Sequence, residues 1–266
     1  MSAEFRVVPG ARGALPVVWL HGFLGQPGMW APVLAAMTRA PASALAVLPG
    51  HGPTPWYPAG EGFDGAVEAL AAALPFPGRV GLVGYSMGAR LALALALAHP
   101  ERVAGAVLLG ADPGMRDPAV RVARQAWDDA QAATVERDGI EAFVTGWESL
   151  PVFATQAVLP ADVRARRRQE RLGHTVAGVA WALRSLGTGR MAPRWGGLAG
   201  CAVPLRFVAG TLDAKFAAEA AEAAEATPRG TVGWIEGAGH DAALEAPDAL
   251  ARTVEAFFTE IEGGRA

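Results

Sequence analysis

The stretch "VGLVGYSMGARLALALALA", residues 80–98, joins an apolar run to an Ala- and Leu-rich segment through a serine between two glycines. The apolar run predicts a buried strand, and the segment after the serine predicts a helix. Gly84 and Gly88 permit a turn that is too tight for side chains on either side. Ser86 therefore lies on a sharp strand-turn-helix connection, a position typical of a reactive serine.

Short apolar runs alternate with Ala-rich segments along the rest of the chain, a pattern typical of βαβ units around a mostly parallel sheet. Strands are predicted at residues 16–20, 44–48, 79–84, 103–109, 203–209 and 231–236. Helices are predicted at about 66–74, 87–98, 216–226 and 247–261.

More than ninety residues without a convincing strand separate the predicted strands 103–109 and 203–209. This length is too great for a structureless loop. Apolar periodicity within it favours helices instead. We therefore expect a core formed by residues 1–114 and 193–266, with an inserted helical lid at 115–192.

The composition limits the classes of function. The chain has 266 residues, of which 52% are hydrophobic and 18% are charged, which favours a packed globule. The net charge of −3 argues against a nucleic acid as a partner. Charged or helix-breaking residues interrupt every apolar stretch, so we expect no membrane insertion. The N-terminus lacks the features of a signal peptide, which predicts a cytoplasmic protein. The oligomeric state is left open.

No metal and no cofactor are expected. Cys201 is the only cysteine, which excludes disulfides within the chain and argues against a cysteine-based metal cluster. The basic run "RARRRQER", residues 164–171, is interpreted as the solvated face of a lid helix, since no aromatic residues are interleaved with it. Single arginines on the inner face of that helix could still serve a site.

A serine hydroxyl becomes reactive when an imidazole takes its proton and a carboxylate orients that imidazole. Asp213 in "AGTLDAKF" and His240 in "EGAGHDAALEAP" each follow a predicted strand. Their order after Ser86 resembles that of the α/β-hydrolases, in which serine, acid and histidine follow one another. Asp112 is a competing acid, but it precedes a Pro-Gly pair and is more typical of a turn.

This order predicts the α/β-hydrolase fold, a mostly parallel central sheet flanked by helices with an inserted helical lid. An oxyanion or enolate in such a site needs two preorganised N–H donors. The backbone amide of Met87 supplies one of them. Phe23, in "LHGFLG" after the first predicted strand, supplies the other. The remaining histidines His51, His99 and His174 are more typical of structural or peripheral positions.

Arg90 lies four residues beyond Ser86, so the two side chains share one face of the predicted helix. A buried arginine requires an anion as its partner. No acidic residue lies three or four positions from Arg90 on this helix. Its partner is therefore either a distant acid of the fold or a carboxylate of the substrate.

Further motifs give the chain a closer resemblance. They are Arg90 after the serine, Arg121-x-x-Arg124-Gln125, Trp147 before Pro151-Val152-Phe153, Leu183-Arg184 before "GTG", and Asp213-x-Lys215-Phe216. Together with "WLHGFLG", "LPGHG" and "GAGH" they extend over most of the chain. In these motifs the sequence resembles the MenH family, the 2-succinyl-6-hydroxy-2,4-cyclohexadiene-1-carboxylate synthases of menaquinone biosynthesis.

The resemblance implies roles for particular residues. Ser86, Asp213 and His240 match the family's catalytic triad. The residues that match its substrate-binding positions are Tyr85, Arg90, Arg124, Trp147, Arg171 and Lys215, of which the three arginines would clamp carboxylates. Arg167 or Arg168 could take the place of Arg171. Lys215, the only lysine of the chain, falls in the D-x-K-F motif.

The resemblance also implies a reaction. A small polycarboxylate would lose a ring proton to Ser86 and expel pyruvate in a 2,5-elimination. The alternative is a carboxylesterase or C–C bond hydrolase that uses Ser86 as a nucleophile on an acidic substrate. A noncatalytic relative that serves as a binding protein is a third reading, but such a protein has no need of an intact triad.

Overall fold

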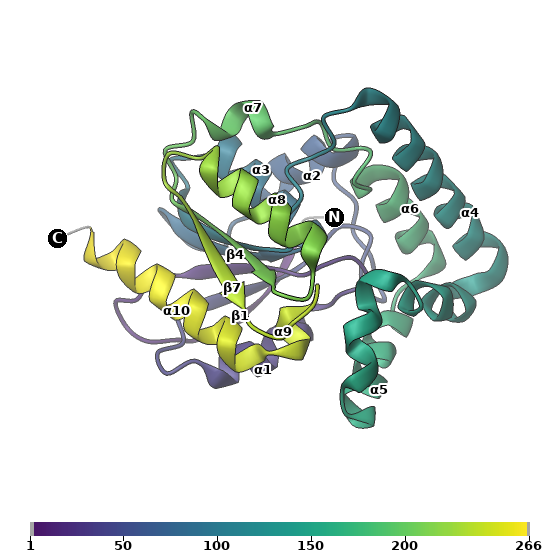
Figure 1. Ribbon diagram of the computed structural model, residues 1–266, viewed down its shortest axis with the longest axis horizontal. Coiled ribbons are helices and arrows are strands. Elements are labelled where there is room, and N and C mark those ends of the chain that lie inside the picture. The colour runs from purple at the N-terminus through teal and green to yellow at the C-terminus, as the bar shows by residue number, and fades with distance from the viewer. Residues whose placement is uncertain (1–2, 265–266) are drawn as a thin grey trace.

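Seven strands form one sheet in the computed structural model, which describes residues 3–264 (Figure 1). The strands are β1 (Glu4–Val8), β2 (Val17–Leu20), β3 (Ser43–Val47), β4 (Val80–Tyr85), β5 (Val103–Leu109), β6 (Leu205–Gly210) and β7 (Gly230–Ile235). Their order across the sheet is β1-β3-β2-β4-β5-β6-β7. All neighbouring strands run parallel except β1, which pairs antiparallel with β3.

The six predicted strands are all present, with ends within two residues of the predicted ends. Strand β1 was not predicted. It is short, lies at the edge of the sheet, and none of its five residues is fully buried. An edge strand of this kind lacks the continuous apolar pattern that marks the inner strands of a parallel sheet.

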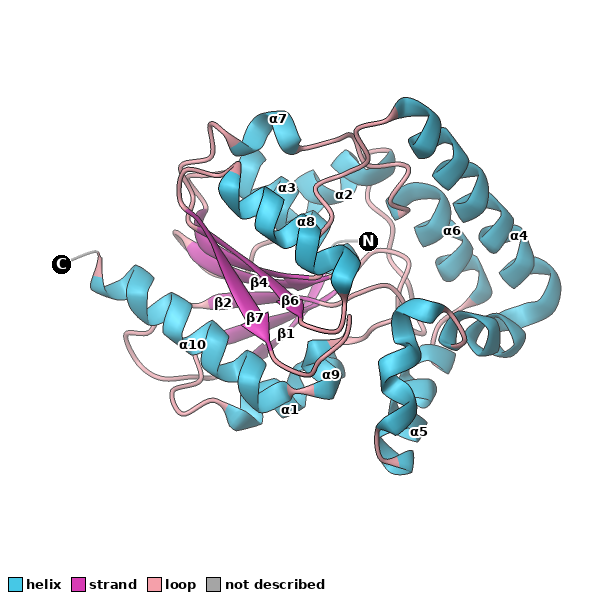
Figure 2. Cartoon of the chain, in the orientation of Figure 1, coloured by secondary structure: helices cyan, strands magenta, loops and turns pink. Residues whose placement is uncertain are grey.

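Helices cover both faces of the sheet (Figure 2). One face carries α2 (Gly62–Ala72), α3 (Met87–Ala98), α7 (Trp195–Leu198) and α8 (Ala214–Glu225), and the other carries η1 (Pro27–Trp30), α1 (Ala31–Ala36), α9 (Ala242–Glu245) and α10 (Pro247–Gly263). Each face has its own cluster of buried apolar side chains. The α/β-hydrolase fold that the sequence predicts is confirmed.

Between β5 and β6 lie α4 (Pro118–Glu148), η2 (Pro151–Val158), α5 (Ala161–Leu172) and α6 (Val176–Leu186). We call these residues, 118–186, the helical insert. It lies beside the core at the carboxyl ends of the strands, with α5 pointing away from the sheet (Figure 1). Gly139, with φ of 80°, breaks α4 in its second half. A third apolar cluster joins α4 to α6 and includes one buried core residue, Leu24.

In the described part of the chain, no helix combines the length and apolarity needed to cross a membrane.

Candidate active site

Ser86 lies between the end of β4 and the start of α3, with φ of 51° and ψ of −109°. This conformation costs an L-residue about 1–3 kcal/mol, which the surrounding packing must offset. The two flanking glycines make the turn possible. A Cβ atom on Gly84 would lie 2.5 Å from the carbonyl oxygen of Gly88, and one on Gly88 would lie 2.1 Å from that of Leu20.

His240 lies between the side chains of Ser86 and Asp213. Its Nε2 is 3.2 Å from the Ser86 Oγ, and its Nδ1 is 2.8 Å from the Asp213 Oδ2. Asp213 follows β6 and His240 follows β7, so both lie at the carboxyl edge of the sheet. The carboxylate favours the tautomer with hydrogen on Nδ1, which leaves Nε2 free to accept the serine proton.

Asp112, the competing acid, has a different environment. Its Oδ1 accepts a hydrogen bond of 2.7 Å from the Gly114 amide, two residues later. This contact closes the turn that leads from β5 toward the insert. Within residues 3–264, Asp112 makes no hydrogen bond to His240, and Asp213 occupies that place.

Aromatic rings surround the His240 imidazole. The ring centroids of Phe216, Tyr85 and Phe153 lie 4.3, 5.3 and 6.4 Å from it. Tyr85 is buried, and burial raises the pKa of its phenol well above 10. The phenol therefore stays protonated at neutral pH. These rings limit the access of water to the imidazole and strengthen its electrostatic interactions.

The backbone amides of Phe23 and Met87 are the two donors that the sequence predicts for an oxyanion. Neither N–H donates a hydrogen bond within the described chain. Phe23 belongs to a tight turn. The Gly25 amide closes this turn by donating a 2.9 Å hydrogen bond to the Gly22 carbonyl. This turn packs against the neighbouring strand, because a Cβ atom on Gly22 would lie 2.7 Å from the Tyr85 ring.

Arg90 is buried, with 7% of its surface exposed. Its Nη1 donates a 2.9 Å hydrogen bond to the Leu186 carbonyl at the end of α6. Among the described residues, no carboxylate lies within ion-pair distance of it. The protein partner is thus a backbone carbonyl, which is neither of the two partners considered from the sequence. Burial lowers the pKa of Arg90 to about 10, although the charge of Asp112 works against this shift.

Arg124 already has an acidic partner. Its Nε lies 2.9 Å from the Oδ1 of Asp128, one turn later on α4. Asp128 is fully buried, whereas the Arg124 side chain is 30% exposed. The guanidinium also lies 4.7 Å from the centre of the Trp127 ring. The spacing of four residues is a recognised helical ion-pair signal, so the sequence could have revealed Asp128.

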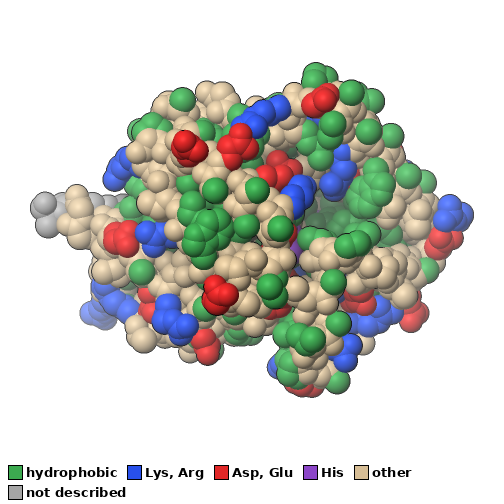
Figure 3. Space-filling model, in the orientation of Figure 1, with side chains coloured by type: hydrophobic (Ala, Val, Ile, Leu, Met, Phe, Trp, Pro, Cys, Tyr) green, Lys and Arg blue, Asp and Glu red, His purple; other side chains and the backbone are tan. Residues whose placement is uncertain are grey.

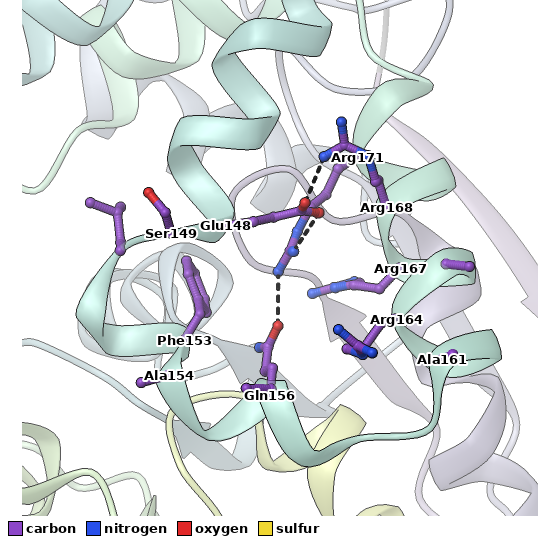
Figure 4. Close-up of a pocket in the computed structure, with 13 residues that line it drawn as sticks. Glu148, Ser149, Phe153, Ala154, Gln156, Ala161, Arg164, Arg167, Arg168 and Arg171 are labelled. Atoms are coloured by element: carbon purple, nitrogen blue, oxygen red, sulfur yellow. Dashed lines mark hydrogen bonds and ion pairs between the residues drawn. The ribbon is translucent and has the colours of Figure 1, made fainter.

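Arg171 lines a cavity of about 580 Å³ between η2 and α5 (Figure 4). Its Nη1 lies 2.9 Å from Glu148, and the Nη1 of Arg168 lies 2.7 Å from the other oxygen of that carboxylate. Gln156 contributes its Oε1, 3.5 Å from the Arg171 Nη2. Burial lowers the pKa of Arg171, as does the nearby charge of Arg167. The cavity lining does not include Ser86 or the other two members of its hydrogen-bonded row.

Arg167 connects the insert to the segment that carries His240. Its Nη2 donates a 2.8 Å hydrogen bond to the Oδ2 of Asp241, and both side chains are buried. Arg166 is largely exposed, as the interpretation of residues 164–171 as a solvated face predicts, whereas Arg167 and Arg171 are buried and belong to the inner face that the sequence left open for a site.

Trp147 and Lys215 have different surroundings. Trp147 packs against Phe23, with ring centroids 4.8 Å apart. The Lys215 side chain is 59% exposed and lies 3.7 Å from Glu219. Burial raises the pKa of Glu219 to about 7, with a contribution from the charge of Asp112. Figure 3 shows a hollow between the core and the insert, with Lys or Arg side chains on its rim.

Sequence reasoning missed the acids that hold the insert arginines, Glu148 above all, and the amide of Gln156. No motif marks Glu148, because it contacts residues 20 and 23 positions away through the packing of α4 against α5. Within the described chain, no group of three or more His, Cys, Asp or Glu side chains is arranged to hold a metal ion.

Comparison with known proteins agrees with this architecture. Residues 17–253 match the model of the "Alpha/beta hydrolase family". A Bacillus subtilis (strain 168) protein, provisionally named 2-succinyl-6-hydroxy-2,4-cyclohexadiene-1-carboxylate synthase, is 33% identical over 95% of this chain and 93% of its own. The synthase of that name from Serratia proteamaculans (strain 568) is 32% identical over 91% and 92%.

A solved structure gives the same result. The structure of MenH from S. aureus superposes with a TM-score of 0.92 at 30% identity, and the match covers 98% of this chain and 99% of that one. The chain therefore belongs to the α/β-hydrolase family and, within it, to the MenH family of 2-succinyl-6-hydroxy-2,4-cyclohexadiene-1-carboxylate synthases.

Proposed function

We propose that this protein is a lyase of menaquinone biosynthesis that eliminates pyruvate from a cyclohexene polycarboxylate and releases 2-succinyl-6-hydroxy-2,4-cyclohexadiene-1-carboxylate. The observation that carries the proposal is the row Ser86–His240–Asp213 beside a helical insert rich in arginine. The names of the relatives at 32–33% identity support the same product.

In this proposal Ser86 acts as the general base. Its hydroxyl proton passes to the His240 Nε2, and the Ser86 Oγ then removes the ring proton of the substrate. The electrons of the broken C–H bond form a new ring double bond, the existing ring double bond shifts by one position, and the C–O bond to the enolpyruvyl group breaks. The leaving enolate takes up a proton to become pyruvate. Asp213 stabilises the imidazolium that exists in between.

Negative charge develops on the substrate during proton removal. We assign the amides of Phe23 and Met87 to the stabilisation of this charge, since no protein acceptor occupies them. Arg90, Arg124 and Arg171 would hold the substrate carboxylates. For the last two, a protein carboxylate already holds the guanidinium in place.

The remaining assignments concern the surroundings of the site. Tyr85, Trp147 and Lys215 would line it, and residues 115–192 would act as a lid over it. We propose a small polycarboxylate substrate as the partner, with no nucleic acid, no cofactor and a cytoplasmic location.

A turnover assay tests the proposal. The purified protein is given the menaquinone intermediate that carries the enolpyruvyl group and, separately, p-nitrophenyl esters. Pyruvate release from the first substrate, absent in Ser86→Ala, supports the lyase. Fast cleavage of the esters without pyruvate release would replace it with the alternative, a serine hydrolase for an acidic substrate.

A further inference from the structure

Three buried histidines outside the proposed triad pack in a row between the core and the helical insert. His21 follows β2, His51 follows β3, and His174 lies between α5 and α6. The ring centroids of His21 and His51 lie 5.0 Å apart, and those of His51 and His174 lie 5.2 Å apart, both edge-to-face. At most 5% of each residue is exposed. Apolar rings would pack as well, so the ring nitrogens must explain the choice of histidine.

The hydrogen bonds of His51 fix its tautomer. Its Nδ1 lies 2.8 Å from the Pro49 carbonyl, to which it must donate. The Nε2 is therefore an acceptor, and it receives a 3.2 Å hydrogen bond from the Leu24 amide. Only a neutral imidazole can make this pair of contacts. His21 repeats the pattern between the Gly22 carbonyl and the Leu48 amide.

Leu24 is the residue that this arrangement holds. Its φ is 56°, a left-handed conformation that is unfavourable for leucine. Its side chain is fully buried in the apolar cluster of α4 and α6. The insert thus fixes the Leu24 side chain, and His51 fixes its amide. Phe23, the preceding residue, lies edge-on to the His51 ring at 5.7 Å.

The insert also contacts this loop through His174. The Nδ1 of His174 accepts a 2.9 Å hydrogen bond from the amide of Gly52, next to His51. The other groups that could influence the His51 imidazole are the neighbouring histidines, Glu4 of β1, which lines the same small cavity, and Arg167 of α5, whose charge acts on His174. Burial dominates in lowering the pKa values of His51 and His174.

We propose that His51 is a positioning residue that holds Leu24 in its left-handed conformation and thereby directs the Phe23 amide toward the oxygen on which negative charge develops. The inference rests on the proposed function only for the role of that amide. Removal of the acceptor releases Leu24, and the amide before it loses its alignment. A misplaced donor of this kind costs roughly 10- to 100-fold in rate.

Two variants separate the effect of the hydrogen bond between the Leu24 amide and His51 from the effect of the packing of the His51 ring. His51→Phe retains the edge-to-face packing and removes the acceptor, whereas His51→Gln offers a carbonyl oxygen to the Leu24 amide. His99→Gln, at a partly exposed histidine at the end of α3, controls for the loss of a histidine. Amide hydrogen exchange is measured at Leu24. We expect exchange to accelerate at least about 10-fold in His51→Phe and to be largely restored in His51→Gln.

Kinetics then connect the loop to the chemistry. For pyruvate release we expect kcat to fall about 10- to 100-fold in His51→Phe, with KM within about threefold of the parent value and partial recovery in His51→Gln. Equal losses in both variants, in step with a lower melting temperature, would show a merely structural role and overturn the proposal. So would unchanged exchange at Leu24, or faster exchange without any loss of rate.

A second readout separates this inference from the proposed function. A p-nitrophenyl phosphonate labels an activated serine, because the Ser86 Oγ forms a bond to phosphorus, p-nitrophenolate leaves, and His240 takes the serine proton. The developing P–O⁻ charge uses the same two amides. If the parent protein is labelled but releases no pyruvate, the lyase assignment fails, and a 10-fold slower labelling of His51→Phe still supports His51 as a positioning residue. Without labelling or pyruvate release, the Phe23 role and this inference both fail.

Discussion

The serine side of the site and the arginine side are built by different means. Ser86, Asp213 and His240 each follow a strand of one sheet, so the backbone of the core sets their separation. The arginines of the insert depend on side-chain ion pairs, such as Arg171 with Glu148. Backbone geometry is rigid, whereas an ion pair can be exchanged for another. The sheet therefore fixes the separations among Ser86, Asp213 and His240, whereas the positions of the insert arginines depend on their side-chain partners.

The largest effect expected from this contrast follows the loss of the serine. Ser86→Ala should reduce kcat by about 10⁴-fold or more and leave KM nearly unchanged, because the hydroxyl acts in the reaction and little in binding. Steady-state pyruvate release measures it, with Thr259→Ala at an exposed position of α10 as control. A residual rate within tenfold of the parent would mean that another group removes the proton.

Arg90, a buried arginine on the core helix α3, provides the first test of the arginine side. Arg90→Ala should cost about 2–4 kcal/mol of transition-state binding, a loss of tens- to several-hundred-fold in kcat/KM for the anionic substrate. Arg90→Lys should recover part of this loss, because lysine keeps the charge but not the planar fork. Kinetics and melting temperature are measured on both variants.

The structural interpretation of Arg90 gives the opposite pattern. If its main task is the hydrogen bond to the Leu186 carbonyl, Arg90→Ala will lower the melting temperature and impair anionic and neutral substrates alike. Unchanged turnover of the anionic substrate in this variant would contradict the carboxylate clamp.

The three buried histidines between the core and the insert, His21, His51 and His174, should make the unfolding free energy depend on pH. Burial lowers the pKa of His21 to about 3 and that of His174 to about 4, and it lowers that of His51. The unfolded chain binds protons at these histidines below about pH 6.5, whereas the folded chain does not. Their stabilisation is complete above that pH and is lost as the pH falls toward 4.

Glu219 has the opposite effect on the unfolding free energy. Its pKa is raised to about 7 in the folded chain, so between about pH 6 and 5 the folded chain binds a proton there that the unfolded chain does not. We therefore expect a net loss of about 2–3 kcal/mol of unfolding free energy per pH unit between about pH 6 and 5. Urea denaturation at several pH values measures the slope. His174→Asn should reduce the slope, and a flat profile in the parent protein would show that the histidines take up protons without unfolding.

The smallest effect concerns the partner of Arg171. Glu148→Gln removes the carboxylate that Arg168 and Arg171 share, so a substrate carboxylate meets less repulsion there. We expect KM to fall several-fold, with a loss of about 1 kcal/mol in stability. Glu136→Gln, which breaks an exposed pair with Arg184, is the matched control. A higher KM in Glu148→Gln would instead show that this acid orients the arginines for substrate.

The same contrast explains what could be predicted from the sequence. The inner strands have continuous apolar runs, and Asp213 and His240 follow two of them, so their place at one edge of the sheet follows from topology. The edge strand β1 has no such run. The partner of Arg90 could not be predicted, because the Leu186 carbonyl, 96 residues later at the end of α6, comes close to Arg90 only in the folded chain.

The insert also affects the order in which the chain can fold. Strand β5 pairs with β6, but residues 110–204 separate the two. At roughly 5–20 residues per second, the ribosome needs about 5 to 20 s to make this stretch. During that time the open edge of β5, with all seven residues apolar or glycine, has no strand to pair with. An unpaired apolar edge of this kind favours association between chains, so helices of the insert that fold before β6 is made would reduce that association.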